Sequence, residues 1–253
     1  MSPNEYLRAI LAREQVDNSL YSPVRGVITT LLPTLAQWAG SYLVAVQPSG
    51  SFSKGTANQS GTDIDVFVSV SSTTPDALKQ IYGTLVTKLT QIGYLPRQQN
   101  VSIGITVNGY SVDVVPAKRQ GQFGDDHSLY RRKADTWTKT NVTTHISLVS
   151  GSGRLEEIRV VKLWRNQKCL DFPSFYLELA VLEALRWRPI GAVSDNVWQV
   201  FTYLRDTFPA ARFVDPANTN NVISDDLTAV ARTQIKAAAT LALQATNWNQ
   251  IVV

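Results

Sequence analysis

Residues 50–70 read GSFSKGTANQSGTDIDVFVSV, and this stretch carries the strongest signals for fold and function. A Gly-Ser turn and a polar loop lead to two aspartates, Asp63 and Asp65, at the head of an apolar run. The β-branched and aromatic residues that follow predict a strand. Because side chains at positions i and i+2 of a strand point the same way, the two carboxylates should project together. Two carboxylates beside backbone N–H donors suit Mg²⁺ and a triphosphate that the ion bridges.

A third carboxylate, Asp113, lies within the apolar run 112–116, which a turn joins to an alternating stretch at 101–107. The pattern predicts a β-hairpin. A buried carboxylate without a partner is costly, so Asp113 is expected to share metal ions with the first pair of aspartates. The three carboxylates predict a two-metal site with ions about 3.5–4 Å apart, where one ion activates an attacking hydroxyl and the other steadies a leaving pyrophosphate. Two Mg²⁺ ions are expected, with Mn²⁺ as the alternative metal.

The aspartate pattern resembles that of the polymerase-β-like nucleotidyltransferases, which share a Gly-Ser pair, an Asp-x-Asp pair and a distant third Asp on a strand. Gly-Ser-x-x-x-Gly-Thr at 50–56, followed by Asp-Ile-Asp at 63–65, is similar to one branch of that superfamily. The branch holds oligoadenylate synthases, cyclic GMP–AMP synthase-like enzymes, their bacterial relatives the cyclic-oligonucleotide synthases (CD-NTases), and archaeal CCA-adding enzymes. Walker and dinucleotide-binding motifs are both absent from the sequence. The resemblance implies an α/β (α+β) nucleotidyltransferase core with a small mixed sheet flanked by helices, an all-helical domain after it, and an active site in the cleft between them.

The resemblance also implies which residues contact the nucleotide. The RVVKLW stretch at 159–164 is similar to a helix whose lysine touches the triphosphate, and PSFYLEL at 173–179 to an element that contacts phosphate and stacks on the base. FVDPAN at 213–218 is similar to an element near the end of the helical domain. The implied nucleotide-binding residues are Gly50, Ser51, Lys54, Thr56, Lys162, Ser174, Tyr176 and Asp215. The residues alone leave other roles open, since Lys162 can equally be a surface lysine, Ser174 a helix cap and Tyr176 a core aromatic.

Hydrophobic periodicity divides the chain into two parts. A strand–helix–strand–strand order in the first part is typical of a compact α/β core, and after residue 154 the pattern is helical throughout. Helices are predicted over 3–16, 23–38, 76–93, 155–168, 175–186, 194–208 and 229–246. We therefore expect a nucleotidyltransferase core with N-terminal helices over 1–150, and a helical nucleotide-binding domain over 151–253.

Between residues 117 and 142 the chain turns polar and basic, with aromatic residues interleaved. This stretch is predicted as a loop or flap beside the active site. Lys118, Arg131, Arg132 and Lys133 are candidates for contacts to a triphosphate or to an acceptor strand, since basic and aromatic side chains suit phosphates and bases. A solvated basic face is the alternative.

The composition is that of an ordinary globular protein, with 253 residues, 44% hydrophobic and 17% charged. The formal net charge of +4 and the pI of about 9.2 suit phosphate-bearing ligands without requiring nucleic acid. A single cysteine, Cys169, excludes an internal disulfide and a cysteine-based zinc cluster. The sequence shows no secretory signal and no long apolar run, so a cytoplasmic protein without a membrane partner is expected. His127 and His145 are expected to have no direct role.

The predicted reaction moves a nucleoside monophosphate from a nucleoside triphosphate such as ATP to a hydroxyl, with release of pyrophosphate. Asp63, Asp65 and Asp113 are the expected catalytic and metal-binding residues. Resemblance to the bacterial cyclic-oligonucleotide synthases implies that the acceptor is another nucleotide. The product would then be a cyclic or linear second messenger, a kind of signal that serves anti-phage defence in that family.

Two alternatives stay open on the sequence. The first is a template-independent enzyme that acts on the 3′ end of an RNA or tRNA, as CCA-adding enzymes do, with residues 118–133 as the seat of the RNA. The short chain favours a nucleotide acceptor, because CCA-adding enzymes carry further RNA-grasping domains. RNA is also a candidate activator. The second alternative, an inactive nucleotide sensor, is disfavoured because all three aspartates are intact.

Overall fold

The computed structural model describes residues 1–19, 21–61 and 63–253. Within these ranges the chain forms two compact units, which we call the sheet unit and the helical unit. The sheet unit comprises Asp17–Lys54 and Asp63–Ile146. The helical unit comprises Met1–Val16, Gly55–Thr62 and Ser147–Val253. The predicted combination of a mixed α/β core with an all-helical part is confirmed.

The strands of the sheet unit hydrogen-bond into one mixed sheet, seven-stranded in the described part of the chain. They are β1 (Leu43–Pro48), β2 (Ile64–Val70), β3 (Arg97–Gln98), β4 (Ile103–Val107), β5 (Tyr110–Arg119), β6 (His127–Arg131) and β7 (Thr136–Thr140). The strand order is β1-β2-β5-β4-β3, and β6 pairs with both β5 and β7. β2 and β5 run parallel, whereas the other pairs are antiparallel. The predicted hairpin of the third aspartate is thus β4 and β5.

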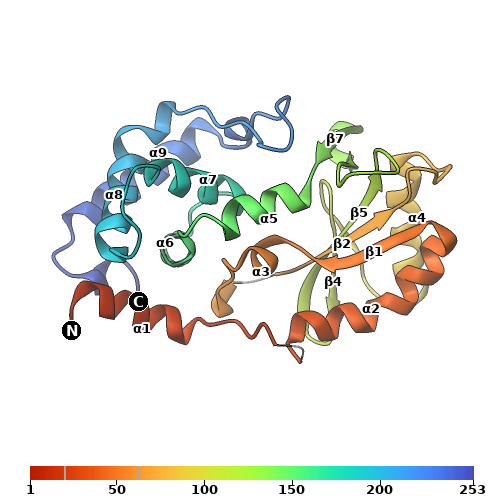
Figure 1. Ribbon diagram of the computed structural model, residues 1–253, viewed down its shortest axis with the longest axis horizontal. Coiled ribbons are helices and arrows are strands. Elements are labelled where there is room, and N and C mark those ends of the chain that lie inside the picture. Colours follow the sequence, from red (N-terminus) through yellow and green to blue (C-terminus); the bar gives the residue numbers. More distant parts are fainter. Residues whose placement is uncertain (20, 62) are drawn as a thin grey trace. The chain divides into compact units, whose positions relative to one another are not determined.

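Helices α2 (Pro23–Ala39) and α4 (Leu78–Gln91) cover one face of this sheet (Figure 1). Valines at alternate positions of β2 and β5 pack with them in one buried core: Val66, Val68, Val112 and Val114. Side chains alternate between the two faces of a strand. Asp65 and Asp113 therefore lie on the face that α2 and α4 leave uncovered.

The basic stretch was predicted as a loop or flap beside the active site, and the loop is wrong because β6 and β7 form a β-hairpin there. Its place beside the active site stays a prediction. β6 and β7 pair antiparallel, with Tyr130 opposite Trp137, and β6 also pairs with the end of β5. Leu129 turns inward and is buried in a small core with Phe67. The interleaved aromatic residues and the threonines of β7 favour strands, and the basic residues around the turn concealed this pattern.

His127 opens β6 and is buried in the sheet unit. Its Nδ1 donates a hydrogen bond to the carbonyl oxygen of Asp125 at 2.8 Å. The Nε2 of the neutral ring then accepts from Ser69 Oγ at 2.8 Å. Burial lowers the pKa of His127, because the charged imidazolium is less well solvated here than in water.

We expect the stability of the protein to fall as the pH is lowered through the titration of His127. Because its pKa is lowered in the folded state, the neutral ring contributes stability that is complete above the ordinary pKa of about 6.5. That stability is lost below it, by at most about 1.4 kcal/mol per pH unit. Urea denaturation at several pH values between about 7.5 and 5 should show a steeper loss for wild type than for His127→Gln. His145→Gln is the matched control, and equal slopes for wild type and His127→Gln would assign the effect elsewhere.

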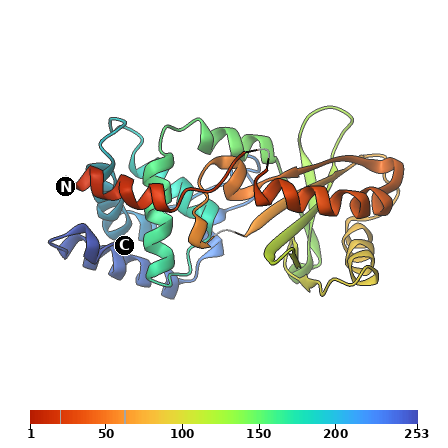
Figure 2. The same ribbon diagram turned by 90° about the horizontal axis from the view of Figure 1, so that it is seen from below.

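The helical unit packs its helices around a single large core. They are α1 (Pro3–Arg13), α6 (Leu155–Gln167), α7 (Ser174–Ala184), α8 (Val193–Asp206) and α9 (Ala229–Gln244), and α5 (Val142–Ser150) carries the boundary between the two units. All helices predicted after residue 154 are confirmed, whereas α5 was not predicted. Figures 1 and 2 show both ends of the chain close together in this unit, where Tyr6 Oη donates to the carbonyl oxygen of Val252 at 3.1 Å. Among the described helices, none has the length and apolar character needed to cross a membrane.

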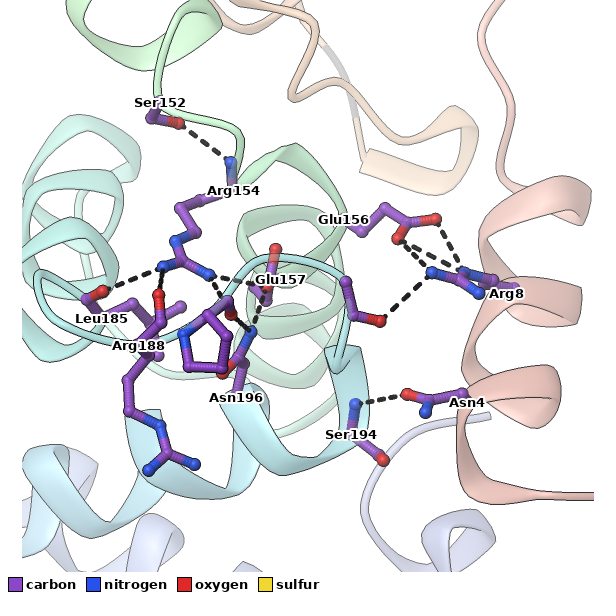
Figure 3. A network of polar contacts seen from close by, with 12 residues as sticks. Asn4, Arg8, Ser152, Arg154, Glu156, Glu157, Leu185, Arg188, Ser194 and Asn196 are labelled. Atoms are coloured by element: carbon purple, nitrogen blue, oxygen red, sulfur yellow. Dashed lines mark hydrogen bonds and ion pairs between the residues drawn. The ribbon is translucent and has the colours of Figure 1, made fainter.

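A buried polar network lies where α6 and α8 begin (Figure 3). Arg154 and Glu157 are both buried and their charged groups lie 3.5 Å apart. Asn196 Nδ2 donates to Glu157 Oε1 at 2.8 Å. The Arg154 guanidinium also donates to backbone carbonyls of the connection between α7 and α8: Leu185, Arg188 and Pro189. The network therefore supplies hydrogen-bond donors to backbone carbonyls of this connection, which has no regular secondary structure to pair them.

The first helix packs differently from its predicted place in a 1–150 core. Leu7, Ile10 and Leu11 of α1 are buried in the core of the helical unit. Asn4 Oδ1 also accepts from the backbone N–H of Ser194 at 2.8 Å, next to the network of Figure 3. α2, in contrast, packs in the sheet unit as expected. The functional domain boundary near residue 150 stays a prediction.

Candidate active site

The turn after β1 brings the backbone of Gly50 against the side chain of Asp65. The Ser49 backbone N–H donates to the Asp65 carbonyl oxygen at 2.9 Å. A short helix, α3 (Gly50–Lys54), starts at this point, where the sequence predicted only a turn and a loop. Gly50 has φ +58°, and a Cβ added there would lie 1.7 Å from Asp65 Oδ2. Both the backbone conformation and the carboxylate therefore exclude a side chain at this position.

Two of the predicted catalytic carboxylates lie side by side on neighbouring strands. Asp65 and Asp113 are register partners on the parallel strands β2 and β5, and both are half-buried. Asp63 is exposed and immediately precedes Ile64, the first residue of β2. The fold thus places all three aspartates in the sheet unit, with Asp65 next to the backbone turn at Gly50.

Asp113 is held by polar groups that the sequence did not single out. Gln99 Nε2 donates to Asp113 Oδ1 at 2.7 Å, and Ser102 Oγ donates to Asp113 Oδ2 at 3.4 Å. Gly104 is the register partner of Asp113 on β4, and a Cβ there would lie 3.2 Å from Asp113 Oδ1. Burial, followed by the negative charge of Asp63, raises the pKa of the Asp113 carboxyl. The polar run at 97–102 opposite the aspartate strand was the available signal for these partners.

The donor set suits a divalent metal, although the coordinating group is not assembled. Carboxylate oxygens are the ligands that Mg²⁺ prefers, and a cation would offset the repulsion between Asp63 and Asp113. Within residues 1–19, 21–61 and 63–253, however, no three His, Cys, Asp or Glu side chains are grouped so that they could hold one ion. Asp113 instead points to Gln99 and Ser102. Joint coordination by the three aspartates stays a prediction.

The basic residues proposed for phosphate or acceptor contacts have different surroundings. Lys118 Nζ donates to the carbonyl oxygens of Thr74 at 2.5 Å and Asp76 at 3.2 Å, which ties it to the loop before α4. Arg132 Nε donates to the Gln99 carbonyl oxygen at 3.1 Å, so Arg132 supports the turn that holds Asp113. Arg131 is half-buried and Lys133 exposed. Of the four, Arg131 and Lys133 keep their predicted role most readily.

The helical unit buries two of the predicted nucleotide contacts in one cluster. Lys162 Nζ lies 2.5 Å from Glu178 Oε1 and 2.8 Å from Thr56 Oγ1. Thr56 and Lys162 are buried, as is Glu178. The alternative of a surface lysine is therefore wrong, and the triphosphate contact of Lys162 stays a prediction. Lys54, at the end of α3 in the sheet unit, is also buried.

The start of α7 separates the residues of the predicted phosphate and base element. Ser174 is exposed and accepts a hydrogen bond from Arg165 Nη1 at 3.0 Å. Tyr176 has 0% exposed surface, so it is a core aromatic rather than a base-stacking residue. Its ring packs against three phenylalanines: Phe172, Phe208 and Phe213. Phe175, which the sequence analysis passed over, is half-buried and is the aromatic of this element that keeps exposed surface.

Asp215 shapes its own loop. Its Oδ1 accepts from the backbone N–H of Ala217 at 2.9 Å, and its Oδ2 accepts from Asn221 Nδ2 at 3.2 Å. The side chain is 5% exposed. The carboxylate therefore stabilises the turn around the Asp-Pro and Asn-Asn pairs, and its predicted nucleotide contact stays a prediction.

Comparison with known proteins shows that the chain has the nucleotidyltransferase fold. The CD-NTase CdnG of Bradyrhizobium diazoefficiens, solved in complex with GTP, superposes on this chain with a TM-score of 0.78 at 12% identity. The superposition covers 98% of this chain and 95% of the CdnG chain. The Cid1 poly(U) polymerase, solved with Mg and 3′-dATP, superposes with a TM-score of 0.68 at 12% identity, covering 97% and 95%. Among curated proteins, a cyclic AMP-AMP-AMP synthase of Escherichia coli (strain MS 115-1) is 25% identical over 216 residues, 69% of this chain and 67% of that protein. No protein-family model matches the sequence. The resemblance inferred from the aspartate pattern is thereby confirmed.

Proposed function

We propose that the chain is a Mg²⁺-dependent nucleotidyltransferase that joins nucleotides into a cyclic or linear oligonucleotide second messenger. The observation that carries the proposal is the pairing of Asp65 with Asp113 on parallel strands, beside a glycine turn that contacts the Asp65 carboxylate. Similarity to a cyclic AMP-AMP-AMP synthase supports a nucleotide as the acceptor. The proposed reaction transfers a nucleoside monophosphate from a nucleoside triphosphate to a hydroxyl and releases pyrophosphate.

The sheet unit supplies the residues for this chemistry. Asp63, Asp65 and Asp113 are proposed to hold the metal through their carboxylate oxygens. When bound, Mg²⁺ lowers the pKa of the attacking hydroxyl and balances charge on the leaving pyrophosphate. The backbone N–H groups of Gly50 and Ser51 are proposed to contact the phosphates. The structural neighbour solved with Mg and 3′-dATP supports a divalent metal requirement, and the number of ions and the use of Mn²⁺ belong to the proposal.

Incubation of the purified protein with Mg²⁺ and all four labelled nucleoside triphosphates, without RNA, tests this function. We expect a phosphatase-resistant oligonucleotide that mass spectrometry identifies in the wild-type reaction. Asp63→Ala should yield none, while the matched control Asp76→Asn, an exposed aspartate of the same unit, should yield the wild-type amount. Turnover by Asp63→Ala within about tenfold of wild type, equivalent to about 1.4 kcal/mol of barrier, would contradict the assignment.

RNA tailing is the second candidate, favoured by the exposed basic turn between β6 and β7 and by the likeness to a poly(U) polymerase. In that case the label should enter added RNA rather than a small oligonucleotide. Binding of RNA should also weaken steeply as salt is raised, because phosphate contacts release counterions. A product made without RNA, at a rate that RNA leaves unchanged, excludes this candidate.

A further inference from the structure

Residues 55–61 belong to the helical unit, although the chain on either side of them belongs to the sheet unit. The segment precedes Asp63 in sequence and carries the Gly-Thr pair of the nucleotidyltransferase pattern. Side chains from α6 and α7, together with Glu14 just after α1, hold it. These anchors are the strongest feature of the molecule that the proposed chemistry leaves unused.

The first anchor is the buried cluster around Thr56. Its hydroxyl donates to Glu178 Oε1 at 2.7 Å and accepts from Lys162 Nζ at 2.8 Å, so both roles of the hydroxyl are used. The exposed fractions are 0% for Thr56, 4% for Lys162 and 0% for Glu178. Buried charges are tolerated only when they are paired and hydrogen-bonded. The ion pair therefore has little freedom to release Thr56.

The second anchor involves Asn58 and Arg159 of α6. Arg159 Nε donates to Asn58 Oδ1 at 3.0 Å, and Asn58 Nδ2 donates to the Arg159 carbonyl oxygen at 2.9 Å. Glu14, just after α1, accepts from the backbone N–H of Gln59 at 3.1 Å through its carbonyl oxygen and from that of Ser60 at 2.8 Å through Oε2. The segment is thus bonded at Thr56 and again at residues 58–60.

We propose that Lys162 and Glu178 are positioning residues, which fix segment 55–61 through Thr56 and thereby set the place of Asp63 for its metal ion. Asp63 follows Gly61 by two residues, so the Asp63 Cα lies within about 7.6 Å of the Gly61 Cα. The proposal rests on the proposed function, because it takes Asp63 as a metal ligand.

This role differs from direct contact of Lys162 with a triphosphate. To reach a phosphate, the ammonium group would have to leave Glu178, which has 0% exposed surface. Removing one partner of a buried pair leaves an uncompensated charge and is strongly destabilising. The two roles also predict different variants to be harmful, since positioning requires the Thr56 hydroxyl, whereas direct contact of Lys162 with a phosphate does not.

Hydrogen exchange followed by mass spectrometry tests the anchoring without requiring any activity. Thr56→Val keeps the shape and removes the hydroxyl. We expect exchange in peptides covering residues 55–66 to become at least about tenfold faster, as loss of hydrogen bonds to charged groups implies. Thr233→Val, an exposed threonine of α9 whose hydroxyl bonds only within its own helix, is the matched control. Unchanged exchange in Thr56→Val would overturn the anchoring.

A titration with Mn²⁺, followed by the electron paramagnetic resonance of the free ion and without nucleotide, tests the effect on Asp63. Thr56→Val should weaken Mn²⁺ binding by about tenfold or more, the scale of effects from residues that orient metal ligands. The double variant Lys162→Met with Glu178→Gln should do the same, and it avoids a buried unpaired charge if single variants fail to fold. Wild-type Mn²⁺ affinity in both variants overturns the proposal. The proposal is also overturned if the double variant binds nucleotide more weakly than wild type while Thr56→Val binds nucleotide normally.

The outcomes separate this proposal from the proposed function. If wild type turns over nucleotides and Thr56→Val binds Mn²⁺ normally, the proposed function stands and the positioning role is excluded. If wild type makes no product but Thr56→Val binds Mn²⁺ more weakly than wild type, the positioning role stands and the proposed function is excluded. A wild-type protein that binds no Mn²⁺ overturns both.

Discussion

Asp113→Asn is expected to lower nucleotidyl transfer by at least about 1000-fold while making the protein more stable without metal. The catalytic loss follows from weakening a metal contribution worth several kcal/mol, since each 1.4 kcal/mol corresponds to about tenfold in rate. The gain in stability follows from the surroundings of the carboxyl. Burial and the charge of Asp63 raise the pKa of Asp113, so the fold disfavours the ionised form. An amide is neutral and can still accept from Gln99 Nε2, which lies 2.7 Å from Oδ1.

The sign of the pH dependence distinguishes this expectation from a general structural effect. With its pKa raised in the folded state, ionised Asp113 reduces stability at every pH above that pKa, and the reduction disappears as the pH falls through it. The melting temperature of Asp113→Asn should therefore exceed that of wild type at neutral pH, and the difference should shrink in acid. Added Mg²⁺ should raise the melting temperature of wild type but not of the variant. A variant that is both active and less stable than wild type would contradict the assignment.

Gly50→Ala is expected to cost at least about 100-fold in turnover, the scale of loss that a displacement near 1 Å produces in a catalytic group. A Cβ at this position would lie 1.7 Å from Asp65 Oδ2, and Gly50 has φ +58°, where side chains are unfavourable. The carboxylate has to move for the methyl group to fit. Steady-state kinetics with labelled nucleoside triphosphates should show the loss mainly in kcat, because Asp65 is proposed to act on the reacting groups.

Gly93→Ala separates displacement of Asp65 from backbone strain. Gly93 has φ +93° but nothing within 4 Å of an added Cβ, so it carries comparable strain without the clash. We expect both variants to lose about 1–2 kcal/mol of stability and only Gly50→Ala to lose activity. Equal turnover in the two variants would show that the approach of Gly50 to Asp65 has no catalytic importance.

Regular elements with a clean period were predictable, and those with mixed signals were not. The apolar spacing of α2, α4 and α6 and the alternation of β4 are local properties, and the structure has these elements where the sequence predicted them. The β6–β7 hairpin was predicted as a loop, because its basic and polar residues lack an apolar alternation strong enough to outweigh them. α1 was correct as a helix, but its period could not tell which core its apolar face would join.

The candidate site divides in the same way. The aspartates and Gly50 could be singled out as candidates because the Gly-Ser and Asp-x-Asp pairs lie close together in sequence and Asp113 interrupts an apolar strand. Gln99 and Ser102 escaped notice, since nothing in a polar run shows which side chain reaches Asp113. For Tyr176 the sequence left base stacking and a core position open, and packing decided for the core, since phenylalanines from three other segments enclose the ring.

The sequence by itself determined the α/β class with its helical part and the nucleotidyltransferase resemblance, because these depend on spacings of a few residues. Tertiary structure alone decided that Lys162 is buried against Glu178, and that residues 55–61 belong with the helices. Thr56 and Glu178 are 122 residues apart in the chain, and Asn58 and Arg159 are 101 apart. The choice of such partners depends on how whole elements pack, and burial then changes what a lysine can do, since a charge removed from water must keep its counterion.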